Sequence, residues 1–189
     1  MTKLLAAAVA VVALAAWLPP QSNMAQPQTY TAFAVNLNAT GRRATTSPVD
    51  ITITRWSTDS ERDQLKNVLK EKGQDALLSA LQKLPVVGYI KTPTSLRWDL
   101  HFARSRPSGD GGQMIFLATD RPMSSWEAWN QPRSVQYPFT LIQLQLDKSG
   151  HGVGKASIAT RITEDDDGTI ELENFQAGPV MLNDVRPEK

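Results

Sequence analysis

The residues that could carry acid–base or nucleophilic chemistry are few and far apart in this chain. It has two histidines, His101 and His151, and no cysteine. No Gly-x-Ser-x-Gly motif accompanies them, so the sequence lacks the pattern of a serine hydrolase. His151 falls in the glycine-rich stretch 149–152, and His101 lies at a polar position of an alternating segment. We expect His151 to be solvated and His101 to face water, or to line a cavity if the barrel is wide. This leaves no histidine-based triad.

The sequence also gives no support for metal or phosphate chemistry. A zinc site needs about four converging ligands, and two distant histidines without a thiol do not supply them. The acidic run 164–167 is contiguous, whereas calcium loops take ligands from alternating positions. The glycine-rich stretch 109–112 lacks the lysine and the following helix of a phosphate loop. We therefore predict no metal and no cofactor, and we expect hairpin turns at these two segments.

Paired carboxylates are the remaining catalytic candidates. Asp99, Asp120 and Glu127 could converge, with Arg97 and Arg121 nearby. Glycoside cleavage and related acid–base reactions need two carboxyl groups at a defined separation. Structural ion pairs explain the same residues more simply, so a cofactor-independent carboxylate enzyme is our second alternative function.

Aromatic side chains gather in the stretch SSWEAWNQPRSVQYPF, residues 124–139. Its first residues have the form of a capping box, and two tryptophans three positions apart share one face of a helical turn. The indoles either plug the end of a sheet or offer a platform to a glycan ring or an apolar ligand. The candidate ligand-binding residues are Trp126, Glu127, Trp129, Asn130 and Arg133, together with Trp98 and Asp99 of the strand pattern described next.

Period-two alternation predicts strands through most of the chain. The clearest run is 96–102, where Leu96, Trp98, Leu100 and Phe102 alternate with polar residues. Glycine-containing turns separate many of these patterns. Short strands joined in this way predict a mainly β (α+β) domain, built as an antiparallel barrel or sandwich. The other strand patterns cover residues 33–38, 49–54, 86–90, 113–119, 140–146, 153–162, 169–175 and 180–185.

The period becomes helical between residues 58 and 84. Thr58 and Glu61 have the spacing of a capping box, and leucines follow at helical intervals. Gly73 interrupts the pattern, and Pro85 ends it. The sequence thus predicts a helical hairpin at about 58–84, inserted in the β domain. Its two short amphipathic helices, joined at Gly73, would cover a sheet face or an opening of the barrel.

The N-terminus has the pattern of a secretory signal peptide. Lys3 precedes an apolar run over residues 4–18, which two prolines end. The run is shorter than the roughly 18–20 residues of a spanning helix. We therefore predict that residues 1–25 are removed after Ala25. A cut after Ala15 or Ala16 and an uncleaved membrane anchor are the alternatives. A single domain, 26–189, would then remain in the periplasm or outside the cell, without a membrane span.

Several motifs spread over the predicted mature chain carry a family resemblance. They are VDITI at 49–53, RWSTD at 55–59, KG at 72–73, VGYI at 87–90, TDRP at 119–122, WEAWN at 126–130 and YPFT at 137–140. With these motifs the chain resembles a group of small exported bacterial proteins. The resemblance implies export and a single domain, and it supplies no catalytic residue, cofactor or substrate.

The net charge of the chain bears on which classes of partner the protein can bind. The formal net charge is +1, and removal of Lys3 would cancel it, so no electrostatic argument favours nucleic acid as a partner. We expect first an exported envelope or extracellular domain that binds a small apolar molecule or a glycan without catalysis. The first alternative is a structural or protein-interaction module with no small ligand, whose partner would be an envelope protein.

The signal-peptide pattern generates a prediction about processing. We expect the mature protein to begin at Gln26, because Ala25 follows the apolar run and the two prolines. Intact-mass measurement of protein from the periplasm or the medium checks this start. Recovery of the chain with Met1 from the membrane fraction would contradict it.

Overall fold

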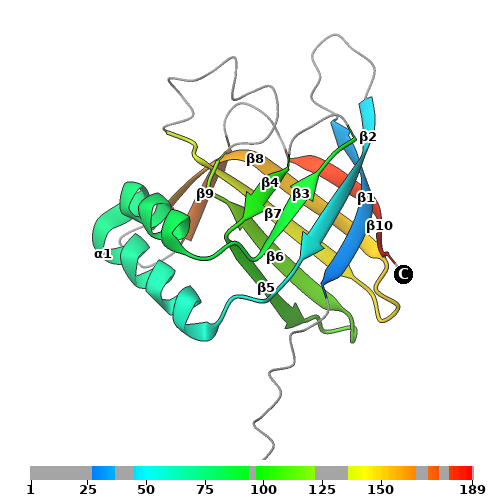
Figure 1. Ribbon diagram of the computed structural model, residues 1–189, viewed down its shortest axis with the longest axis horizontal. Helices are drawn as coiled ribbons and strands as arrows, with labels where there is room; N and C mark the ends of the chain where they lie inside the picture. The colour runs from blue at the N-terminus through cyan, green and yellow to red at the C-terminus, as the bar shows by residue number, and fades with distance from the viewer. Residues whose placement is uncertain are drawn as a thin grey trace, which may run out of the picture.

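Ten antiparallel strands and one kinked helix make up the part of the chain that the computed structural model describes: residues 27–36, 45–93, 97–121, 136–164, 170–174 and 179–188. The strands follow the order β4-β3-β2-β1-β10-β8-β7-β6-β5, and β9 pairs with β8 beside this path. The sheet curls into a nearly closed barrel (Figure 1), which confirms the predicted mainly β class. The strands are β1 Gln28–Asn36, β2 Thr45–Ile53, β3 Gly88–Lys91, β4 Trp98–Leu100, β5 Phe102–Pro107, β6 Gln113–Thr119, β7 Phe139–Leu146, β8 Gly152–Glu164, β9 Ile170–Asn174 and β10 Val180–Pro187.

Residues 98–107 close the barrel, because this run of chain forms β4 and β5, the strands at the two ends of the sheet. β4 pairs with β3, and β5 pairs with β6. Between β4 and β5, the backbone N–H of His101 donates to the Ala118 carbonyl over 3.0 Å. The side chain of His101 is 12% exposed, and its Nδ1 lies 3.0 Å from the Leu84 carbonyl oxygen. The expectation of a solvated His101 is therefore wrong, because this residue occupies the closure of the barrel.

Helix α1, Asp59–Lys83, is a kinked helix rather than the predicted hairpin. The capping box is confirmed: Thr58 Oγ1 accepts from the Glu61 N–H at 3.2 Å, and Glu61 Oε2 accepts from the Thr58 N–H at 2.7 Å. The break at Gly73 is also confirmed, with φ 74° and ψ −169°, a conformation that glycine adopts without strain. No loop separates the two segments, so the prediction of a hairpin is wrong. Gly73 itself is non-helical and joins the two helical segments at a kink.

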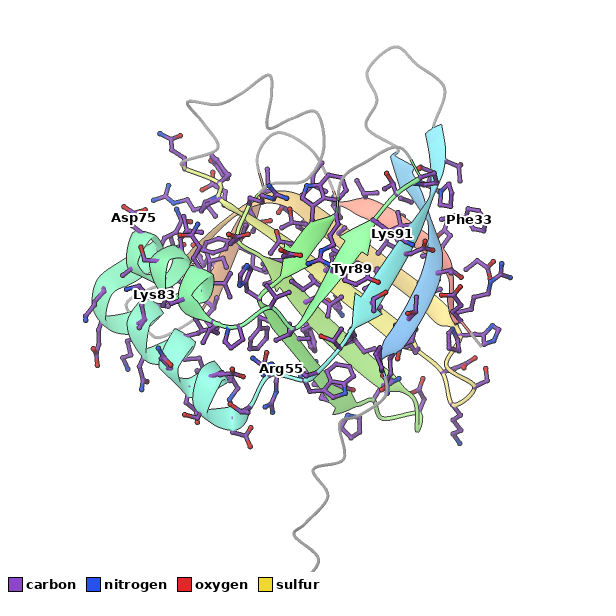
Figure 2. The ribbon with its side chains drawn as sticks, in the orientation of Figure 1. Phe33, Arg55, Asp75, Lys83, Tyr89 and Lys91 are labelled. Carbon is purple, nitrogen blue, oxygen red and sulfur yellow. The ribbon has the colours of Figure 1, made fainter. Side chains whose placement is uncertain are left out.

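The turn between β2 and α1 is fixed by charged side chains of the motif RWSTDSE. The Arg55 guanidinium contacts Glu61 twice, at 2.8 and 3.1 Å, in the two-point geometry that favours arginine–carboxylate pairs. Arg104 of β5 donates to the Ser57 carbonyl at 3.2 Å and pairs with Asp59 at 2.9 Å. Arg55 lies where the chain passes from the barrel to α1 (Figure 2). We call the contacts among Arg55, Thr58 and Glu61 the clasp.

Two apolar cores lie on opposite sides of the sheet. The first fills the barrel interior, where buried side chains alternate with outward ones along the strands. The second lies between α1 and the outer face of β6, β7 and β8. In it, Leu65, Leu69, Leu77 and Leu81 of the helix meet Ala118 and Phe139. Helix α1 accordingly stands beside the barrel rather than inside it (Figure 1). The buried interior residues are Tyr30, Ala32, Val49, Ile51, Ile53, Val87, Ile90, Leu100, Ala103, Ile115, Leu117, Ile142, Leu144, Leu146, Ala156, Leu182 and Val185.

The outer core yields a stability prediction. Leu69→Ala and Leu77→Ala should each lower the free energy of unfolding by about 2–5 kcal/mol, because each removes a buried side chain beneath α1. Leu172→Ala removes the same atoms from a side chain that is 56% exposed and should cost less than about 1 kcal/mol. Urea denaturation of the three variants gives the comparison. Equal midpoints for all three would show that α1 does not rest on the barrel.

The clasp yields a second prediction, which depends on pH. The hydrogen bond from Arg55 lowers the pKa of Glu61 from 4.5 to about 2; burial opposes this shift, and the Thr58 N–H adds to it. The unfolded chain therefore takes up this proton at a higher pH than the folded chain does. The contribution of Glu61 to stability is fully present above about pH 4.5 and is lost as the pH falls toward about 2.

The variant Glu61→Gln tests this dependence. At pH 7 it should lower the free energy of unfolding by about 1–2 kcal/mol, and this difference from the wild type should shrink as the pH falls from 4.5. Glu71→Gln makes the same chemical change at an exposed site of the same helix and should cost about 0.5 kcal/mol or less. A Glu61→Gln deficit that stays constant down to pH 2.5 would contradict the assignment.

Candidate functional site

The structure separates the two predicted ligand-binding residues that it describes. Trp98 is 9% exposed and lies in register with Ile90, which is fully buried. Asp99 points to the other face, because successive residues of a strand alternate in direction. Trp98 and Asp99 therefore lie on opposite faces of β4 and do not form a single ligand-binding site. The other five candidates, Trp126, Glu127, Trp129, Asn130 and Arg133, lie outside the described residues.

Two of the three carboxylates considered for catalysis, Asp99 and Asp120, lie among the described residues, and each has a basic side chain within 4 Å. Asp99 lies 2.8 Å from Arg97 Nε, and the Arg97 guanidinium stacks over the Tyr89 ring at 5.0 Å from its centre. Asp120 Oδ1 lies 3.8 Å from Nε2 of His101. Asp99 thus has the structural ion pair that we expected of it, whereas Glu127 lies outside the described residues.

A polar cavity of about 840 Å³ opens at one end of the barrel, where β1 and β6 begin and β7 and β10 end. We call it the mouth. Residues 27–30, 111–113, 147–150 and 187–188 form its walls. In Figure 1 this end points downward, with the β5–β6 and β7–β8 turns at its edge. The mouths of β-barrels are common places for small-molecule sites.

A chain of hydrogen bonds crosses the barrel at the base of the mouth. Ser105 Oγ donates to Gln113 Oε1 at 3.0 Å, and Gln113 Nε2 donates to the Tyr30 hydroxyl at 3.5 Å. That hydroxyl donates in turn to Gln28 Oε1 at 3.2 Å. Three strands separate β1 from β6 in the sheet, so the contact between Gln113 and Tyr30 spans the interior. We call these four side chains the floor.

The floor rests directly on the apolar core. In the strand registers, Tyr30 lies opposite Ile51, Gln28 opposite Ile53, Gln113 opposite Leu146 and Ser105 opposite Ile115. All four of these partners are at most 2% exposed. The polarity of the barrel therefore changes within one layer of side chains, from an apolar interior to a hydrogen-bonding surface.

Tyr30 supplies a neutral hydroxyl at the centre of the floor. The residue is 4% exposed. Burial raises the pKa of its hydroxyl above the ordinary value of 10.0, and the hydrogen bond with Gln113 partly offsets that effect. The group stays protonated at neutral pH, so it can both donate and accept hydrogen bonds.

Two carboxylates hold the turns at the rim of the mouth. Asp147 accepts from the Ser149 hydroxyl at 2.6 Å and from the N–H groups of Ser149 and His151 at 2.7 and 3.1 Å. Asp110 accepts from the Ser108 hydroxyl and the Gly112 N–H. These bonds, the serine hydroxyls foremost, lower the pKa of both carboxyl groups. The rim is thus built of the tight turns that the sequence predicted, and His151 is exposed as expected.

The mouth was not predicted from the sequence, although one feature of the sequence indicates it. Gln28 lies on the same face of β1 as the buried Tyr30 and Ala32, and Gln113 lies on the same face of β6 as the buried Ile115, although Gln28 is exposed and Gln113 is half-buried. A polar residue in core register at the first position of a strand marks a barrel end that is open to water. In a single sequence, this signal is hard to tell from a strand that begins one residue later.

The described part of the chain holds no group of three or more His, Asp or Glu side chains arranged for a metal ion. Its one helix, α1, is not apolar enough to cross a membrane. Comparison with known proteins found no match to a family model, a curated protein or a solved structure. The resemblance to small exported bacterial proteins therefore stays a prediction.

Proposed function

We propose that the protein is an exported binding module that holds a hydroxyl-rich ligand, a glycan, in the mouth of its barrel. The observation that carries this proposal is the floor, which places an amide, a phenol and a second amide across a cavity of about 840 Å³. Small-molecule sites commonly have volumes of about 300–1,000 Å³ and a few convergent polar groups. Export follows from the signal-peptide pattern and locates the protein in the periplasm or outside the cell.

The chemistry of the floor favours a glycan over an apolar molecule. Carboxamides and hydroxyls both donate and accept hydrogen bonds, as sugar hydroxyls do. A carboxamide can make up to four such bonds, so Gln28 and Gln113 retain capacity beyond the bonds of the floor. The buried side chains of the interior core already occupy the space in which an apolar ligand would lie.

The state of the nearby carboxylates supports binding without catalysis. A general acid or base is most effective when its pKa lies near the working pH. Asp110 and Asp147 have lowered pKa values, and both are engaged by turn N–H groups and serine hydroxyls. These two carboxylates stabilise the rim of the mouth, and the side chains of the floor recognise the ligand.

Titration with neutral oligosaccharides tests the proposal. Cellotriose, maltotriose and chitotriose serve as probes, followed by amide chemical shifts of the mature protein. At least one should shift the amides of Gly111, Gly112, Ser149 and Gly150, which line the mouth. Tyr30→Phe should weaken that binding about twofold to tenfold, because it removes one hydroxyl from the floor.

Tyr89→Phe provides the matched control, since it removes a hydroxyl from the outer face of β3 (Figure 2). It should leave the affinity unchanged, and thermal unfolding should show that both variants are folded. Equal effects of the two substitutions, or shifts centred away from the mouth, would overturn the proposed site. Absence of any shift with all three probes at millimolar concentration would overturn the glycan assignment.

A further inference from the structure

Strand β9 is a short exposed strand at the opposite end of β8 from the mouth. Its five residues, Ile170–Asn174, are all exposed. Within the described residues it pairs with β8 alone, opposite Thr160–Glu164. A strand paired on one side presents backbone N–H and C=O groups along its other edge, which can pair with a further strand.

The two faces of β9 differ in chemistry. Ile170 and Leu172 are 46% and 56% exposed, and they share one face of the strand. Leu172 lies opposite Ile162, which packs against the outer core beneath α1. Glu171 and Glu173 occupy the other face, where Glu173 lies 3.9 Å from the guanidinium of Arg161, its partner in β8, and Glu171 lies opposite the uncharged Thr163. A strand added to this edge would therefore extend an apolar surface on one side and meet two carboxylates on the other.

We propose that β9 is a docking edge for an extended segment of another protein in which Lys or Arg residues alternate with apolar ones. Basic residues opposite Glu171 and Glu173 would form cross-strand ion pairs, and apolar residues opposite Ile170 and Leu172 would cover their exposed surface. β9 is already held in place for this role. Glu173 accepts a hydrogen bond of 2.7 Å from the Tyr137 hydroxyl, and Asn174 accepts one of 2.9 Å from Thr160.

The charges also exclude a second copy of this chain as the partner. An antiparallel pair of β9 strands that keeps the apolar residues on one face must place residues of the same kind opposite each other. In the register centred on Leu172, Glu171 of each copy faces Glu173 of the other, which makes two Glu–Glu pairs. A shift by two residues still leaves one such pair, Glu171 opposite Glu171 or Glu173 opposite Glu173. Like charges in direct opposition destabilise a strand pair, so the edge selects a basic partner.

Two synthetic pentapeptides test the docking edge. The first is acetyl-Val-Lys-Val-Lys-Val-amide, and the second carries Glu in place of both Lys. The Lys peptide should bind and should slow the amide hydrogen exchange of residues 170–174, whereas the Glu peptide should not bind. Glu171→Lys should weaken binding of the Lys peptide about threefold to tenfold and allow the Glu peptide to bind.

Glu71→Lys makes the same charge change on the exposed surface of α1 and should leave binding of both peptides unchanged. Equal effects of Glu71→Lys and Glu171→Lys would show general charge attraction and overturn the proposal. Protection that appears outside β9, or no binding of the Lys peptide at millimolar concentration, would also overturn it. Circular dichroism establishes that both variants keep the sheet. The glycan titration reports on the other end of β8, so either proposal can fail without the other.

Discussion

The structure depends on the bend at His101, where one run of chain passes from one end of the sheet to the other. β4 completes the ladder with β3 before the bend, and β5 begins the ladder with β6 after it. The backbone of His101 bonds to β6, and its ring lies within hydrogen-bonding distance of the Leu84 carbonyl at the end of α1. His101 therefore contributes both to closing the barrel and to holding the C-terminal end of α1 in place. Opening this run would expose two sheet edges and free the C-terminal cap of α1.

The turn from β2 to α1 secures the same closure from its other side. The Ser57 N–H donates to the Ala103 carbonyl at 2.8 Å, and the Ser57 hydroxyl accepts from the Ala103 N–H at 3.0 Å. One residue later, Thr58 caps the helix, and Arg55 and Glu61 fix the turn. The motif RWSTD is thereby explained by architecture: each of its polar side chains positions either β5 or α1. Such a motif can look functional in a sequence while its chemistry is structural.

Local patterns in the sequence predicted much of this fold. Alternation predicted most of the strands, and the capping box with Gly73 predicted the start and the kink of α1, because each signal depends on neighbouring residues alone. The run 96–102, predicted as one strand, is divided between β4 and β5 at His101. The hairpin was wrong because a glycine with positive φ can redirect a helix as well as end it. The burial of His101 was missed because its partners, Leu84 and Ala118, are fixed by barrel closure. The floor was missed for the same reason, since Tyr30 and Gln113 meet only across the closed interior.

The packed interior of the barrel limits the places where the protein can bind a ligand or a partner protein. A closed barrel of about eight strands has just enough space for its own side chains, and here isoleucine, leucine and valine fill that space. The two recognition surfaces that we propose accordingly lie at a strand end and at a strand edge. At the mouth, the interior ends in amides and a phenol whose hydrogen-bonding capacity the floor only partly uses. At β9, the sheet ends in a backbone edge whose side chains already distinguish an apolar face from an acidic one. The two surfaces lie at opposite ends of β8, so one strand connects two chemically different parts of the protein.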